Sequence, residues 1–230
     1  MDLPVGLSVA VYAGVLVVGV VVAVAARRQE AGVVAVGVGA WLALDLGLAA
    51  AGVFATDADT WVPVIGVGIV GPVVVGTWLL SDPTGRVAVL ADRLPMRWLI
   101  EVQLFRVVGA VFLVGWAVGV MPAAFAIPAG TGDVAVGLAA PWVARRVGRD
   151  PVGGRGAAVI WNVAGVADLA VAVTLGFLTA PSHMQQLAGS DPNFAISRLP
   201  FVLIPVFAVP VALLLHGIGL RRLTSERVFV

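Results

Sequence analysis

The sequence predicts an all-α, polytopic membrane protein with seven transmembrane helices, the N-terminus outside and the C-terminus inside. This prediction depends on the composition, the lengths of the apolar stretches and the distribution of arginine. Of the 230 residues, 60% are hydrophobic and 12% are charged, and the mean hydropathy is +1.06. Soluble domains are about 45–50% apolar and about 25% charged, so this chain has too few charged residues to cover a water-soluble fold.

Seven apolar stretches are each close to the roughly 20 residues that a helix needs to cross a bilayer. Charged residues, prolines and glycines separate them. Within each stretch, polar and apolar residues do not alternate as they do in the strands of a β-barrel. The stretches predict one seven-helix domain over residues 1–230, with spans at 5–26, 31–55, 61–80, 98–120, 123–144, 157–180 and 199–219.

Arginine sets the predicted orientation, because the chain contains no lysine. Cytoplasmic loops of membrane proteins are enriched in basic residues. With the N-terminus outside, only Arg198 lies outside and only Arg106 lies within a span. The inner segments then hold the other twelve arginines: Arg27, Arg28, Arg86, Arg93, Arg97, Arg145, Arg146, Arg149, Arg155, Arg221, Arg222 and Arg227. We expect a multi-pass protein of the cell (plasma) membrane, of the bacterial inner-membrane type.

Short matches between the two halves predict an internal repeat, although chance matches are common in a chain rich in Val, Ala and Gly. Asp45 in the second span corresponds to Asp168 in the sixth, each followed by Leu. The predicted plan is 3+1+3, with parallel repeats 5–80 and 123–219 joined by a linker helix at 98–120. In helix count, direction and repeat plan, this layout is similar to that of SWEET-type and PQ-loop transporters. The Pro-Gln pair of the latter is absent, so no residue is carried over.

Ionisable side chains inside the spans are the candidate functional residues, because each costs about 2.5–3.5 kcal/mol to insert and therefore needs a partner or water. Arg106 lies about 13 Å along its helix from Arg97, too deep to reach either surface easily. We expect it to pair across helices with Asp45, Asp133 or Asp168. The pair is either a structural tie between helices or a site that binds an anionic substrate or gates a carboxylate.

Asp168 has a small residue and an indole on its own helix, Gly165 and Trp161, which leaves room for a ligand or water beside a carboxylate. The same glycine also allows close helix packing. Asn162 lies about a turn and a half before Asp168. The predicted substrate-binding residues are therefore Arg106, Asp133, Asp168, Asp45, Trp161 and Asn162, and the predicted proton-coupling groups are Asp168 and Asp45.

Residues 121–133 predict a broken fifth helix. This apolar segment contains two prolines and two glycines, which disfavour a continuous helix. The expected structure is a short re-entrant piece, a break at 128–132 and a helix that begins near Asp133. The start of that helix is either capped by Asp133 or forms a substrate site, as in discontinuous transporter helices.

Three classes of function remain. A small-solute transporter or channel with a polar site at mid-depth fits best. The alternatives are a membrane-embedded enzyme that acts on a lipid or isoprenoid, for which no sequence signature is visible, and a structural or accessory subunit of a membrane assembly. The absence of cysteine, with only two histidines on opposite sides of the membrane, leads us to expect no metal and no cofactor. The expected partners are the lipid bilayer and a small solute or lipid-like ligand, with no nucleic acid at a net charge of +1; a homo-oligomer remains open.

Overall fold

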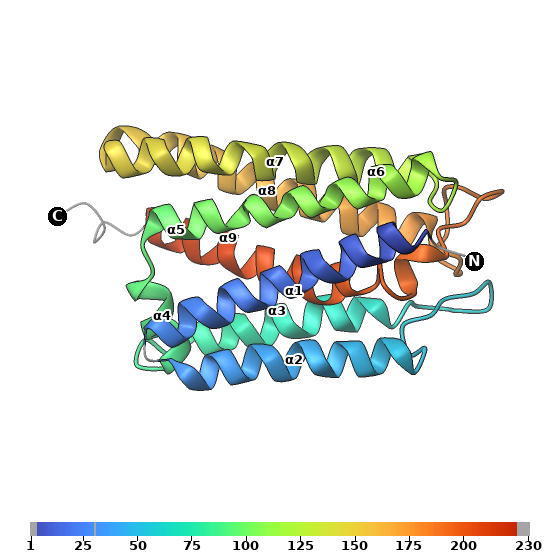
Figure 1. Cartoon of the computed structure of the whole chain (residues 1–230), viewed down its shortest axis with the longest axis horizontal. Helices are drawn as coiled ribbons and strands as arrows, with labels where there is room; N and C mark the ends of the chain where they lie inside the picture. Colours follow the sequence, from blue (N-terminus) through green and yellow to red (C-terminus); the bar gives the residue numbers. More distant parts are fainter. Residues whose placement is uncertain (1–3, 30, 225–230) are drawn as a thin grey trace.

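The computed structural model describes residues 4–29 and 31–224, and the described residues form helices and no strand (Figure 1). Arg227, one of the predicted inner arginines, lies outside them. The elements in chain order are α1 (Val5–Arg28), α2 (Gly32–Ala50), α3 (Ile65–Ser81), α4 (Arg86–Arg93), α5 (Met96–Glu101), η1 (Val102–Gly109), α6 (Ala110–Ala117), α7 (Ala123–Arg149), α8 (Pro151–Thr179), η2 (Ala195–Ser197), η3 (Ile204–Ala208) and α9 (Val209–Thr224).

The long helices have the length and apolar composition of a multi-pass membrane protein, as the sequence predicts. Six segments of the described chain are long and apolar enough to cross a membrane, and a seventh is obtained if α3 and α4 count as one span. The axes of α3 and α4 differ by 85°. The predicted fourth span is a single segment, Met96–Ala117, composed of α5, η1 and α6.

The helices α7 and α8 extend beyond the predicted spans at the arginine-rich end. The prediction leaves residues 145–156 outside any helix, whereas the structure has only Asp150 between the two helices. The Asp150 carboxylate accepts a hydrogen bond from Gly153 N at 2.9 Å and so caps α8, and Pro151 occupies its first turn. An acidic N-cap followed by proline is a strong helix start, and it allows α8 to begin directly after α7.

The fifth span is not broken, so the predicted break at 128–132 is wrong. Helix α7 is continuous through Pro128. Pro128 removes one backbone hydrogen bond, the one to the carbonyl four residues earlier, and a membrane helix tolerates such a loss where other helices pack against it. In the next turn, Thr131 Oγ1 donates to Ile127 O at 2.6 Å. The glycines serve close packing: a Cβ at Gly130 would lie 2.7 Å from Leu113 Cγ, and one at Gly132 would overlap Asp168. Asp133 therefore lies within a helix and does not cap one.

The segments η3 and α9 form the centre of the bundle. Together they are contacted by α1, α3, α5 and α8. Every residue from 200 to 212 is buried. The segment η3 is a π-helix that contains Pro205, and Pro210 follows it in α9. Each proline lacks the N–H that a regular helix needs. The helices α7 and α8 pack along each other on one side of the bundle, and α2 lies at its opposite edge (Figure 1).

Candidate functional site

Arg106 lies halfway along the fourth span, on a stretch of 3₁₀-helix. Side chains three residues apart are aligned on a 3₁₀-helix, and Gln103, Arg106 and Gly109 are all buried on one face of η1. This face packs on α7. Gly109 allows Asp133 of α7 to approach closely, because a Cβ at Gly109 would overlap the Asp133 side chain. A long 3₁₀ run inside a span is uncommon and often marks a functional hinge.

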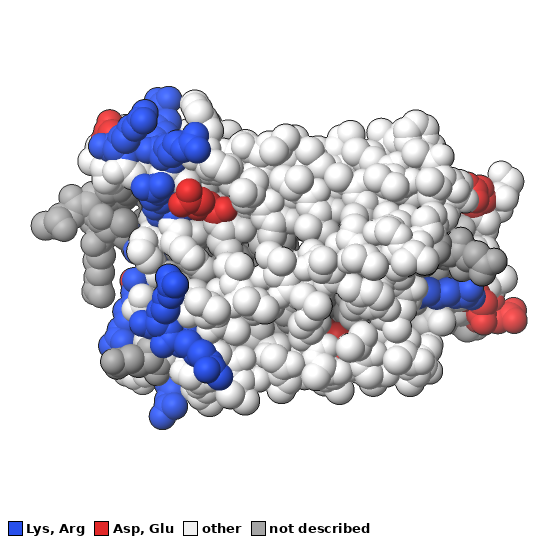
Figure 2. All heavy atoms as spheres, viewed as in Figure 1, with Lys and Arg blue, Asp and Glu red and all other residues white. Residues whose placement is uncertain are grey.

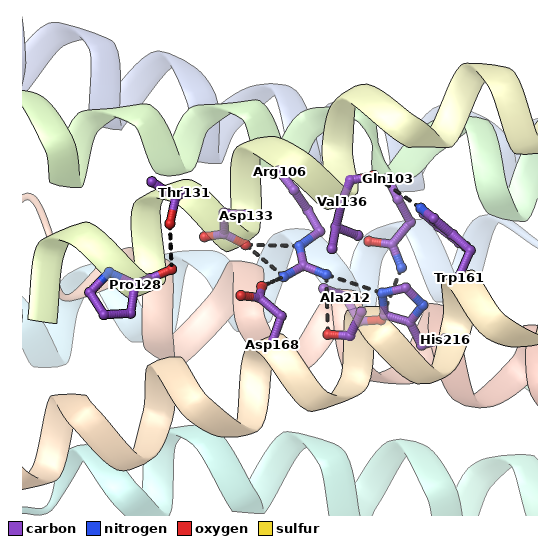
Figure 3. A network of polar contacts seen from close by, with 11 residues as sticks. Gln103, Arg106, Pro128, Thr131, Asp133, Val136, Trp161, Asp168, Ala212 and His216 are labelled. Atoms are coloured by element: carbon purple, nitrogen blue, oxygen red, sulfur yellow. Dashed lines mark hydrogen bonds and ion pairs between the residues drawn. The ribbon is translucent and has the colours of Figure 1, made fainter.

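The guanidinium of Arg106 forms ion pairs with two of the three predicted aspartates (Figure 3). Its Nε and Nη2 each lie 2.8 Å from Asp133 Oδ1, and Nη2 also donates to Asp168 Oδ2. Arg106 is 3% exposed. The predicted pairing of Arg106 across helices is therefore found, and its partners come from α7 and α8. We name Arg106, Asp133 and Asp168 the charged triad.

His216 of α9 continues the network on the other side of Arg106. Arg106 Nη1 donates to Gly165 O at 3.2 Å and lies 3.2 Å from His216 Nε2. Because arginine only donates, His216 Nε2 accepts this bond, and its Nδ1 carries the proton. Nδ1 lies 2.9 Å from Asn162 Oδ1, which accepts that proton's hydrogen bond, and Asn162 Nδ2 donates to Ala158 O at 2.8 Å. Hydrogen bonds therefore connect the triad to Asn162 through one neutral histidine.

Trp161 and Asn162 lie on α8 with Asp168, as the sequence predicts. They contact the triad through His216, which is not among the predicted site residues. The Trp161 ring lies 5.0 Å from the His216 ring, and its Nε1 donates to Val136 O at 3.0 Å. His216 is fully buried. The predicted seventh span ends at 219 and places His216 near a surface, whereas α9 extends to Thr224. The sequence signal that could have identified His216 as a site residue is the free-energy cost of an ionisable group inside a span.

Asp45 does not join this network. It lies on α2 at 4% exposure, and the described residues provide it with no ion pair. Its nearest polar partner is the indole N–H of Trp41 one turn earlier, although the two groups do not meet the distance and angle of a regular hydrogen bond. The prediction that Asp45 shares a site with Arg106 is therefore not met by the geometry.

A largely apolar pocket extends from the loop end of the bundle to the triad. Its empty volume is about 570 Å³, part of it open to the surroundings, and its walls come from α3, α6, α7, α8, η2, η3 and α9. Three phenylalanines line it, Phe112, Phe125 and Phe177, and Asp133 is its one ionisable lining residue. At the loop end, Thr56 Oγ1 donates to Ser197 Oγ at 3.0 Å and ties the 51–64 loop to the segment before α9.

A second pocket of about 370 Å³ lies between α1, η1 and α9. Arg106 lines it, and Asp133, Leu169, Ile204 and Val209 line both pockets. Asp133 thus lies between the two pockets, and Arg106 lines the second one. Within the described residues, no group of three His, Cys, Asp or Glu side chains is arranged to hold a metal ion.

Residues 60–224 match a family described as a domain of unknown function, DUF8737. The matched part contains every residue of the Arg106 network, and also Pro205 and Pro210. It leaves out α1 and α2, and with them Asp45. No curated protein and no solved structure matches the chain.

Proposed function

Because this chain belongs to the DUF8737 family, whose description assigns no activity, we propose a function from the buried site: a small-solute transporter in which the charged triad is the coupling centre. The solute occupies the apolar pocket that ends at Asp133, and Asp168 exchanges a proton as the solute moves. Asp45, which lies apart from the triad, remains a predicted second proton site.

The observation that carries this proposal is the position of the triad residues Asp133 and Arg106 at two pockets of the bundle. Asp133 and Arg106 lie about halfway along their spans, Ala123–Arg149 and Met96–Ala117. The first pocket leads to Asp133 from the loop end, whereas toward the arginine-rich end the bundle is closed by fully buried Gln103, His216 and Ile100. A solute site that is reachable from one end and sealed toward the other is one half of an alternating-access cycle.

Two irregular helices support a conformational change around this site. The triad's arginine is on the 3₁₀ segment η1, and the wall shared by the pockets includes Ile204 of the π-helix η3. Both kinds of turn have weaker or displaced backbone hydrogen bonds and occur at functional hinges. A shift of either segment toward regular helix would move Arg106 or Ile204 relative to Asp133.

The arginine distribution supports a location in the cell membrane with the N-terminus outside. In Figure 2, arginine side chains gather at the end of the molecule where α4 and the last turns of α9 lie, and the opposite end carries few charges. The positive-inside rule makes the arginine-rich end cytoplasmic. The 3+1+3 parallel repeat stays a prediction within this proposal, as does a homo-oligomeric state.

Proton-coupled flux tests the transporter proposal even while the solute is unidentified. The purified protein is reconstituted into vesicles with an internal pH dye, and gradients of cationic, neutral, zwitterionic and anionic solutes are applied in turn. We expect at least one class to drive proton movement in the wild type and not in Asp168→Asn, with Glu101→Gln, an exposed carboxylate on α5, as the active control. The proposal would be contradicted if no solute class drove proton movement in the wild type, or if Asp168→Asn showed the same solute-driven proton movement as the wild type.

A further inference from the structure

The charge of the triad selects the chemical class of the ligand. Arg106 contributes one positive charge, Asp133 and Asp168 contribute two negative charges, and the neighbouring His216 is neutral in the tautomer that its contacts require. The group therefore has one negative charge in excess when both carboxylates are ionised. A buried charge without a partner is costly, so the site favours one additional positive charge.

Arg106 has no donor left for an anionic ligand. Its Nε donates to Asp133, its Nη1 is directed at Gly165 O and His216, and its Nη2 contacts both carboxylates. Asp133, by contrast, uses only Oδ1 for these contacts, and no hydrogen bond to its Oδ2 is made by the described residues. Asp168 likewise uses only Oδ2, so the two acceptors without a hydrogen bond among the described residues are carboxylate oxygens.

Of these two acceptors, only Asp133 Oδ2 belongs to a residue that lines the large pocket. Asp133 lines that pocket, whereas Arg106 does not. Besides Asp133, the polar side chains that line it are Thr56 and Ser197, which lie at the loop end and bond to each other. A ligand that fills this space meets apolar walls along most of its length and one carboxylate at its inner end. Aromatic rings such as Phe112 and Phe125 also attract cations through their faces.

The pocket reaches the space between α3 and α8. Its lining includes Ile65 and Ile69 of α3 and Ala172 and Val173 of α8. These two helices do not pack closely on each other, because α3 packs on η3 and α9, whereas α8 packs on α7 and α9. Phe177 bridges the gap near its loop end, where it approaches Gly66. A ligand with an apolar body can therefore enter between α3 and α8 from the hydrocarbon region.

We propose that the pocket between α3 and α8 binds an amphiphilic organic cation, a protonated amine or quaternary ammonium with an apolar body, whose positive group contacts Asp133. This inference takes its site from the transporter proposal and adds the substrate class.

Direct binding to the protein in lipid nanodiscs tests the ligand class. Three probes of similar size are titrated by calorimetry, with empty nanodiscs as the blank: benzyltrimethylammonium, its neutral isostere neopentylbenzene, and benzylphosphonate. We expect saturable binding of the ammonium probe alone. Tighter or equal binding of either of the other probes would overturn the proposal, because it would mean that the excess negative charge does not select the ligand.

Two variants and a control locate the binding. Asp133→Asn should lower the affinity for benzyltrimethylammonium at least about tenfold, since it removes a buried opposite charge. Ala172→Phe should abolish binding by filling the pocket, and it alters no triad residue. Glu101→Gln should bind as the wild type does. Unchanged affinity for benzyltrimethylammonium in Asp133→Asn or in Ala172→Phe would refute the assignment. If Asp133→Asn does not fold, the affinity of Ala172→Phe alone decides.

The outcome is separable from that of the transporter proposal. If an uncharged or anionic solute drives Asp168-dependent proton flux and the ammonium probe does not bind, the cation assignment fails and transport stands. If the ammonium probe binds at Asp133 and no solute class drives proton flux, the transporter proposal fails, and the pocket is a binding site for cations.

Discussion

Removing Arg106 should destabilise the fold more than removing either of its aspartates. Arg106→Gln leaves two carboxylates facing each other, with side chains only 11% and 14% exposed. Breaking a buried ion pair by removal of one partner costs about 3–5 kcal/mol. For a chain of this size, 1 kcal/mol corresponds to about 2–4 °C in melting temperature, so we expect a decrease of about 6–20 °C.

The aspartate variants retain one ion pair and should be milder. In Asp168→Asn, Arg106 still pairs with Asp133 through two nitrogens, and the variant loses a single charged contact. Hydrogen bonds to charged groups contribute about 1.5–3 kcal/mol, which corresponds to about 3–12 °C. Asp133→Asn should cost more than Asp168→Asn, because Asp133 accepts from both Nε and Nη2.

A triple variant separates charge imbalance from lost packing. Arg106→Gln with Asp133→Asn and Asp168→Asn leaves three neutral amides of similar shape, so it should melt at a higher temperature than Arg106→Gln alone. Tryptophan fluorescence on heating in detergent measures all of these variants. A decrease in melting temperature of less than about 2 °C for Arg106→Gln would correspond to less than 1 kcal/mol. If, in addition, the triple variant were no more stable than Arg106→Gln, the charge-balance reasoning would be refuted.

Two further predictions concern the topology and the packing of the site. A cysteine at Asp57 should react with a membrane-impermeant thiol reagent added outside intact cells, and one at Arg149 should not; the reverse pattern would invert the proposed orientation. Gly109→Ala should lower the melting temperature and the probe affinity, because its Cβ would overlap Asp133. Gly37→Ala is the matched control, since a Cβ there has no atom within 4 Å; equal effects in both would mean that close packing at Gly109 does not position the triad.

The sequence by itself determines the class of protein and the existence of a buried ionic site. A chain with 12% charged residues and seven apolar stretches has no soluble alternative, and a guanidinium midway along a span must pair across helices because its own helix offers no suitable anion. Both conclusions follow from the cost of polar groups in hydrocarbon, which depends on residue type and position along the chain and not on which helices are neighbours.

Only the tertiary structure decided which aspartates pair with Arg106. Helical periodicity shows which residues share a face, but not which neighbouring helix that face meets, so Asp45, Asp133 and Asp168 are equivalent candidates in the sequence. The choice depends on glycines: Gly109 admits Asp133, and Gly132 admits Asp168, because a side chain at either position would overlap the carboxylate. The same close packing of α7 favours a continuous helix over the predicted break, since Pro128 removes a single backbone hydrogen bond from a helix that is packed along its neighbours.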